Sequence, residues 1–321
     1  MHYKKWIFLL FSFSLFLYSL LSLLYIVVDP EQVFKKSITK YKFGYTKYYS
    51  KHQYQKLKEN DYILVFGTSR SQNISSDSQH IDLLNFHNIY GEPGDILNFM
   101  QQLTPQQIKH VKHIYYLVSL TTMRDETDVL NYKKYGFIDQ LEASFPLNNL
   151  GLKNLARDIY NNVRNESIYY YIDNDGSQFL YNKNQTTVLN HTINQPLNIN
   201  INQSQAIQTL GKLDYFCKSH KIKITYFTPT YTDKYKINTE QLQFLWKKLF
   251  NNGIDGFYAL YYLKGVSDNM RDNHYVKFTD SSHLNYTNMN NVFKEMVLNK
   301  NPSFFIKDSQ ESTAYFKSIE R

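Results

Sequence analysis

The chain has 321 residues, of which 42% are hydrophobic and 20% charged, so it is long enough for one large or two small globular domains and is not intrinsically disordered. Its net charge of +8 comes from lysines and arginines scattered along the chain, and we therefore expect no nucleic-acid partner. The single cysteine, Cys217, excludes an internal disulfide and does not identify the redox compartment.

Residues 6–28, WIFLLFSFSLFLYSLLSLLYIVV, form an uncharged apolar segment near the N-terminus. As a helix this segment would be about 35 Å long, which is enough to cross the hydrocarbon core of a bilayer. It is longer than the apolar region of a signal peptide, and no small-x-small cleavage motif follows it. We therefore predict an uncleaved, single-pass transmembrane anchor at residues 6–28 after a cytoplasmic tail of residues 1–5.

The charges that flank the anchor give opposing indications of its orientation. Lys4 and Lys5 precede the segment, as expected for a cytoplasmic N-terminus. Lysines that closely follow the segment favour the opposite orientation: Lys35, Lys36, Lys40 and Lys42. Because large domains are translocated largely regardless of such charges, we expect the following domain on the periplasmic or extracellular side of a bacterial inner (cytoplasmic) membrane.

After the anchor, short apolar runs alternate with segments of helical spacing. Residues 29–60, rich in Lys and Tyr, are predicted as a stalk and a lead-in helix. Strands are predicted at residues 62–66, 85–90, 113–120 and 223–229. Strands that alternate with helices predict an α/β fold with three α/β/α layers and a doubly wound, mostly parallel sheet.

Helical spacing of apolar residues places the helices between these strands. The predicted helical segments are 95–103, 155–163, a helix with Ala206, Leu210, Leu213 and Cys217 on one face, 240–253 ending at Gly253, and a final helix with Met289, Val292, Phe293, Met296 and Val297 on one face. An Asn-rich excursion is expected near residues 182–204. The predicted domain therefore covers residues 61–300, and residues 301–321 form a C-terminal tail.

Ser69 lies in the polar sequence GTSRS, which directly follows the first predicted strand. In open α/β sheets, functional sites form at the carboxyl ends of the strands. We expect a helix after Ser69 to point its first amide groups at whatever Ser69 binds. A nucleophilic serine also needs a base, and a neutral histidine is the usual one near pH 7.

His283 lies in the predicted loop before the final helix, and Asp280 precedes it by three residues. This spacing lets the Asp280 carboxylate hold one imidazole nitrogen while the other nitrogen faces outward. In this hypothesis Asp280 orients His283, which takes the proton of Ser69. The alternative is a polar turn and a capped helix on an α/β protein without this chemistry.

The sequences FGTSRS and TDSSHLN resemble the first and last blocks of the SGNH (GDSL-type) hydrolase superfamily, in which a serine follows the first strand and an Asp-x-x-His loop precedes the last helix. HNIYGEPGDILN resembles the block that supplies a glycine amide, here Gly94. DYFCKSHKIKITYFTPTY resembles the helix-strand-proline segment of membrane-anchored, exported members. The resemblance spans residues 60–298 and implies a flavodoxin-like SGNH fold, with catalytic Ser69, Asp280 and His283 and an oxyanion hole built from Ser69 and Gly94.

The third block of the superfamily departs from the pattern. It usually supplies an asparagine side chain to the oxyanion hole, but YYLVSLTTMRD contains none. Thr121, or alternatively Ser119, would have to donate a hydroxyl instead. Because one missing oxyanion donor costs about 100- to 1000-fold in rate, the departure fits a slow, specialised acyltransferase and equally a lapsed enzyme that only binds.

The resemblance to anchored members implies ester chemistry on cell-envelope material. We expect a membrane-anchored, extracytoplasmic serine acyltransferase or esterase that acts on polysaccharide or polymer esters through an acyl-serine intermediate, without a cofactor. Its expected partners are the lipid bilayer, a cell-surface polysaccharide or polymer, and a separate membrane-embedded protein that delivers the acyl group. The alternative is a catalytically lapsed SGNH-fold protein that binds glycans or scaffolds envelope assembly.

Other polar residues are candidate binding groups. Arg70 and Arg124 follow predicted strand ends and can steer an anionic substrate, although surface solubility is the competing interpretation. His110 and His113 have no acidic or cysteine partner at metal-ligand spacing, so we predict no metal site.

Overall fold

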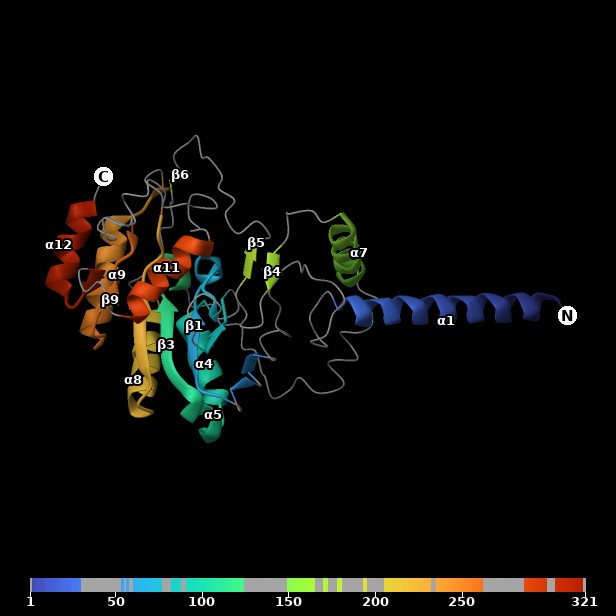
Figure 1. The fold of residues 1–321 in the computed structure, drawn as a ribbon, viewed down its shortest axis with the longest axis horizontal. Coiled ribbons are helices and arrows are strands. Elements are labelled where there is room, and N and C mark those ends of the chain that lie inside the picture. Colours follow the sequence, from blue (N-terminus) through green and yellow to red (C-terminus); the bar gives the residue numbers. More distant parts are fainter. Residues whose placement is uncertain are drawn as a thin grey trace.

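The computed structural model describes residues 2–29, 53–54, 56–57, 60–76, 82–87, 91–123, 149–164, 170–172, 178–180, 193–194, 205–231, 235–261, 286–298 and 304–319. These residues form an α/β domain and one long N-terminal helix that extends away from it (Figure 1). Most of the predicted stalk and of the Asn-rich excursion lies outside the described residues.

The N-terminal helix α1 covers His2–Val28, and its 27 residues correspond to a length of about 40 Å. Among the described residues it is the one helix long and apolar enough to cross a membrane. Its apolar side chains are exposed along most of its length, whereas a core helix of a soluble protein would bury them. Tyr25 and Val28, at the end of α1 nearest the domain (its inner end), are buried against helix α7 (Asn149–Arg164).

A mostly parallel sheet forms the centre of the domain. Its strands are β1 (Tyr62–Phe66), β2 (Leu83–Asn85), β3 (Val111–Leu117), β7 (Lys223–Phe227), β9 (Phe257–Tyr258) and β10 (Phe305–Ile306). The spatial order is β10-β9-β7-β3-β1-β2, and only β10 is antiparallel to its neighbour. The parallel strands thus follow the doubly wound order 2-1-3-4-5, whose switch point lies between β1 and β3. The predicted α/β class with a mostly parallel sheet is confirmed.

One face of the sheet is covered by several helices. They are α4 (Pro93–Gln102), α8 (Ala206–Ser219), α9 (Thr239–Asn251) and α12 (Ser309–Ile319), while α5 (Pro105–His110) leads into β3. The predicted face of α8 is confirmed, because Ala206, Leu210, Leu213 and Cys217 are all buried. The core on this side is aromatic, and the rings of Trp246 and Phe257 stack with centroids 3.6 Å apart.

The opposite face is packed against α11 (Tyr286–Val297). The predicted apolar stripe of this helix is confirmed, since Met289, Val292, Phe293 and Met296 are buried. The ring of Phe293 meets the ring of Tyr115 on β3 edge to face, with centroids 4.8 Å apart.

The predicted C-terminal tail at residues 301–321 is wrong. β10 extends the sheet beside β9, and α12 buries Phe316 and Ile319 in the main core. The strand has only two residues, and α12, with the sequence SQESTAYFKSI, has too few apolar residues to show a clear helical period.

Several predicted boundaries also differ from the structure. β2 ends at Asn85, whereas the prediction placed the strand at residues 85–90. β3 and β7 end at Leu117 and Phe227, each before its predicted end. Two small strand pairs were not predicted: antiparallel β4 (Tyr170–Ile172) with β5 (Gln178–Leu180), and parallel β6 (Ile193–Asn194) with β8 (Tyr235–Lys236). Gly253 ends the α9 region with φ +90, as predicted for a C-cap glycine.

Candidate functional site at the carboxyl edge of the sheet

Gly67 ends β1 in a backbone conformation that favours glycine. Its φ is +150, and a Cβ at this position would lie 2.8 Å from both Leu117 Cβ and Ser71 Oγ. A side chain here would therefore clash with the end of β3 and with the following turn. This close approach places the turn that carries Ser69 at the β1/β3 switch point, where ligands bind in open α/β sheets.

Ser69 begins a single 3-10 turn, η1 (Ser69–Ser71), which Thr68 caps. The Arg70 amide donates to Thr68 Oγ1 at 3.4 Å, and the Ser71 amide donates to the Thr68 carbonyl at 2.9 Å. The Gln72 amide donates to the Ser69 carbonyl at 3.3 Å. The predicted helix with ligand-directed amides directly after Ser69 is therefore wrong, because these amides bond inside the turn.

The buried side chain of Asn85 holds the segment that follows Ser69. Its Nδ2 donates to the carbonyl oxygens of Ser71 and Ile74, at 2.9 Å in each case. Its Oδ1 accepts from the backbone amide of His87 at 3.0 Å. A single amide at the end of β2 thus satisfies several buried backbone groups of the turn, which fixes the turn against the sheet.

Asn290 attaches helix α11 to the same segment. Its Nδ2 donates to the Asn73 carbonyl at 2.7 Å, and its Oδ1 accepts from the Ser75 amide at 2.9 Å. α11 begins at Tyr286, three residues after His283 in the sequence. The first turns of this helix therefore lie beside the segment that follows Ser69. Asp280 and His283 themselves lie outside the described residues.

The amino end of α4 also reaches this edge. A Cβ on Gly91 would lie 3.7 Å from the Gly67 carbonyl oxygen and 3.8 Å from Thr68 Cγ2. The hydroxyl of Tyr116 on β3 donates to the Gly91 carbonyl at 2.8 Å. Burial raises the pKa of Tyr116 far above its usual value, so this donor keeps its proton.

Gly94 is the second residue of α4, so its amide lies in the first turn of the helix. Pro93 has no amide proton, and the N-cap Glu92 makes no side-chain capping hydrogen bond. Helix amino ends carry partial positive charge and bind anions. The helix amino end that meets the Ser69 turn is thus that of α4, and Gly94, the predicted oxyanion donor, lies in its first turn.

Thr121 lies in the short turn η2 (Leu120–Thr122), just beyond β3. Its Oγ1 is 2.7 Å from Ser119 Oγ, and either hydroxyl can be the donor. Two hydroxyls carry two protons and need one for the bond between them, so the other can be donated to a ligand. The structure thus brings together the two hydroxyls that the sequence offered as replacements for the missing asparagine.

Arg70 lies over an aromatic ring at the same edge. Its guanidinium carbon is 5.2 Å from the centroid of the Tyr231 ring, and its Nε is buried without a hydrogen-bond partner in the described part of the chain. The Tyr231 ring stacks in parallel with that of Tyr261, with centroids 6.1 Å apart. The cation therefore lies over a ring that a second ring supports, and it is a suitable group for an anionic substrate. Sequence reasoning missed both tyrosines, although Tyr231 follows the β7 strand end by four residues. Arg124 lies outside the described residues.

The remaining histidines weighed from the sequence lie at other places. His110 Nδ1 is 2.9 Å from Asp61 Oδ1, and His113 Nε2 is 2.8 Å from Thr225 Oγ1. No group of three metal-ligating side chains occurs within the described ranges. His87, which sequence reasoning did not consider, is buried at the carboxyl edge, with its Nδ1 3.3 Å from Asn85 Oδ1.

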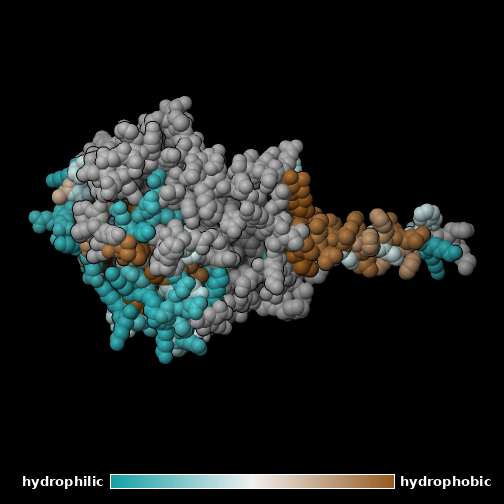
Figure 2. Space-filling model, viewed as in Figure 1, coloured by the Kyte–Doolittle hydropathy of each residue, from teal (hydrophilic) through white to brown (hydrophobic). Residues whose placement is uncertain are grey.

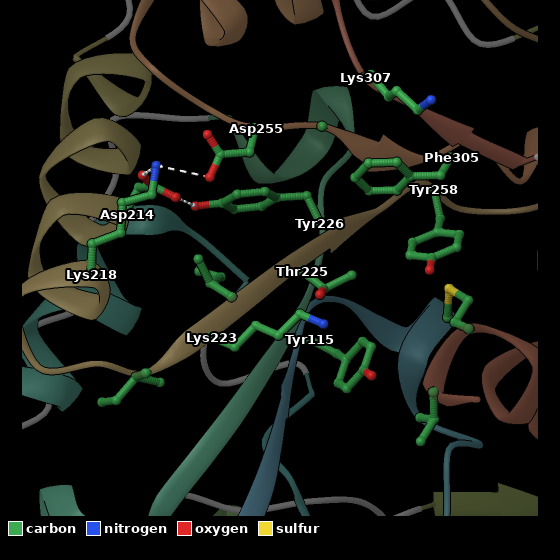
Figure 3. A pocket seen from close by; sticks show the side chains of 15 residues that line it. Tyr115, Asp214, Lys218, Lys223, Thr225, Tyr226, Asp255, Tyr258, Phe305 and Lys307 are labelled. Atoms are coloured by element: carbon green, nitrogen blue, oxygen red, sulfur yellow. Dashed lines mark hydrogen bonds and ion pairs between the residues drawn. The ribbon is translucent and has the colours of Figure 1, made fainter. Parts of the chain in front are cut away.

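A cavity of about 580 Å³ is lined by the first four residues of β7 (Figure 3). Lys218 forms ion pairs there with Asp214 at 2.9 Å and with Asp255 at 3.0 Å. The register of β9 pairs it only with Tyr226 and Phe227, which leaves room beside the first residues of β7. Other lining residues are Tyr115, Lys223, Thr225, Tyr258, Phe305 and Lys307. Of the predicted site residues that the structure describes, Ser69, Arg70, Gly94 and Thr121, none lines this cavity.

Comparisons with protein-family models, with curated proteins and with solved structures found no match to this chain.

Proposed function

We propose that this protein is a membrane-anchored, extracytoplasmic serine acyltransferase or esterase of the SGNH type. Its proposed substrates are esters of cell-envelope polysaccharide or polymer, and α1 anchors it in a bacterial inner membrane. The observation that carries the proposal is the position of Ser69 at the β1/β3 switch point, between the amino end of α4 and the segment bound by α11. This is the edge at which an α/β sheet assembles a nucleophile, a helix amino end and a base.

In the proposed reaction, Ser69 Oγ attacks the ester carbonyl carbon while His283 takes its proton. The carbonyl π electrons move to the oxygen, where the Gly94 amide and a hydroxyl of the Ser119–Thr121 pair stabilise the negative charge. Collapse of this intermediate breaks the bond to the leaving alcohol, which receives the proton from His283. The acyl-serine is then attacked by a polymer hydroxyl or by water, and His283 again transfers the proton.

Arg70 has a separate role in this proposal. Its guanidinium lies over the Tyr231 ring, and its Nε has no hydrogen-bond partner among the residues that the structure describes. An anionic group of the acceptor would supply that partner. We therefore assign Arg70 to substrate binding, with Tyr231 as its support.

The second candidate function is a lapsed enzyme that keeps the fold to bind glycans or to scaffold envelope assembly. The observation that favours it is the bonded Ser119–Thr121 pair beyond the carboxyl end of β3, in the sequence block where the resemblance leads one to expect an asparagine donor. Such a protein would bind the polymer without forming a covalent intermediate.

Active-site labelling tests the proposal on the full chain in membranes. A serine-directed fluorophosphonate should label the wild type, because an activated serine reacts with it covalently. Ser69→Ala should remove the label, whereas Ser219→Ala, which changes an exposed serine on α8, should not. Equal labelling of Ser69→Ala would remove this serine from the mechanism. No labelling of a folded wild type would favour the binding protein instead.

A further inference from the structure

Helix α7 has an apolar stripe that continues beyond its contact with α1. Leu155 is buried and Ile159 packs beside it, against Tyr25 and Val28 of α1. At the two ends of the stripe, Leu152 is 39% exposed and Val163 is 80% exposed. These four α7 residues fall at i, i+3, i+7 and i+11, so they share one side of the helix.

This stripe lies at the place where α1 meets the domain. Figure 1 shows α7 beside the inner end of α1 and across its direction. In Figure 2 the hydrophobic surface over α7 is continuous with that of α1. A long apolar helix that leaves a bilayer at its inner end would therefore bring α7 to the membrane surface, with its length parallel to that surface.

The charges of α7 fit an anionic membrane surface. The helix contains Lys153, Arg157 and Arg164 but only one acidic residue, Asp158, which gives a net charge of +2. The exposed side chain of Tyr160, at 49%, adds a ring with a polar tip of the kind that is favoured at bilayer interfaces. Exposed apolar residues together with basic ones are typical of helices that lie in the headgroup region.

We propose that α7 is an interfacial helix that lies in the plane of the membrane crossed by α1, with Leu152 and Val163 inserted among the lipids. The inference rests on the anchoring role proposed above for α1. A transmembrane helix alone leaves a domain able to tilt, whereas a second contact at right angles limits that tilt. In Figure 1, β3 runs across the direction of α1. The carboxyl edge of the sheet would therefore face parallel to the membrane plane and stay at a fixed distance from the membrane surface.

Site-specific labelling of the full chain in anionic liposomes tests this orientation. Cys217 is buried, and burial raises the pKa of its thiol to about 12, so a thiol-reactive fluorophore will not modify it. Single cysteines are introduced as Val163→Cys on α7, Phe13→Cys on α1 and Tyr215→Cys on α8. The unmodified side chains are similarly exposed, at 80%, 64% and 76%, so each position accepts a label.

The expected result is quenching of the labels at positions 13 and 163 by doxyl lipids, and quenching of the label at 215 by iodide in the water. Lipid contact at 13 combined with water contact at 163 would overturn the interfacial role of α7 and leave the anchor intact. Water contact at both positions would overturn the anchor as well. Protection at 163 that rises with the protein-to-lipid ratio and is insensitive to doxyl lipids would show a second copy of the chain on α7, which also overturns the inference.

Discussion

The two ends of the central sheet are held by different kinds of interaction. At the carboxyl end, the buried amides of Asn85 and Asn290 bind the backbone of the segment that follows Ser69. At the amino end, Asp61 pairs with His110 at 2.9 Å and with Lys112 at 3.1 Å, and its side chain is 56% exposed. Water can replace the exposed pairs but cannot reach the buried ones. We therefore expect the carboxyl end, where we propose the chemistry, to be the more rigid of the two.

The largest expected effect concerns the proposed base. If Asp280 orients His283, Asp280→Asn should reduce turnover by about 1,000- to 10,000-fold, because the amide favours the wrong imidazole tautomer. Folding should be nearly unaffected, as measured by thermal denaturation. Adding Ser69→Ala to this variant should reduce turnover little further, because residues that act as one unit are not additive.

His87 provides the control for this experiment, since it is the buried histidine that the structure describes at the same edge. His283→Ala should remove activity and keep the melting temperature. His87→Ala should lower the melting temperature, and its refolded fraction should keep labelling by the fluorophosphonate. Full activity in Asp280→Asn would indicate that the aspartate only caps a turn.

The second effect is on stability at the carboxyl end. Asn85→Ala removes two 2.9 Å donations and leaves the carbonyls of Ser71 and Ile74 buried without that partner. Each buried group without a partner costs about 1 to 3 kcal/mol, so for the two carbonyls we expect a loss of about 2 to 6 kcal/mol in the free energy of unfolding. Urea denaturation of the full chain in detergent measures it. A loss below that of an exposed substitution would contradict the proposed rigidity of this end.

The parts of the fold that could be predicted are those in which the local periodicity of apolar residues indicates the buried face. β1 was predicted with its observed bounds, and the stripes of α8 and α11 identified their buried faces. β9 and β10 are two residues long and carry no such pattern. They exist because neighbouring strands and α12 complete their packing, which is tertiary information.

For the candidate site, the end of an apolar strand indicated Ser69, whereas Gly94 and Thr121 were indicated by the resemblance to the SGNH superfamily. The sequence could not indicate the residues that hold these positions. Asn290 binds backbone groups of Asn73 and Ser75, which are 217 and 215 positions away in the chain. In so Asn-rich a sequence, one structural asparagine has no local signature. The 3-10 turn at Ser69 was also missed, because Thr68, Ser69 and Ser71 allow side-chain and backbone bonds that compete with a longer helix.

The third prediction uses His113, which lies on β3 toward the amino end. Burial and the charge of Lys223 lower the pKa of His113 from 6.5 to about 4 in the folded protein. Between these two pH values the unfolded chain binds a proton that the folded chain does not, so the free energy of unfolding falls as the pH falls. One pKa unit corresponds to about 1.4 kcal/mol, and we expect a loss of about 2 to 3 kcal/mol over this range.

Substitution isolates this contribution. His113→Gln can keep a hydrogen bond to Thr225 but does not titrate. Between pH 6.5 and 4, unfolding of this variant should therefore take up as much as one proton fewer than unfolding of the wild type, and its free energy of unfolding should fall less steeply as the pH falls. Urea denaturation at several pH values measures the difference. An unchanged pH dependence would show that His113 is solvated more than its burial implies.

The smallest expected effect is that of replacing Asp61, which tests the stability of the amino end of the sheet. Hydrogen bonds from His110 and then from Lys112 lower the pKa of this exposed carboxylate below 3.8. The contribution of the Asp61 carboxylate to the free energy of unfolding is therefore present above its unfolded pKa and is lost as the pH falls through its lower folded pKa. Since exposed ion pairs contribute little, Asp61→Asn should shift the melting temperature by about 2 °C or less near pH 7, and less still at high salt. The same variant should show no difference from the wild type once the pH is below the folded pKa. A shift as large as that of Asn85→Ala would mean that the amino end is held as firmly as the carboxyl end, and the contrast between the two ends would fail.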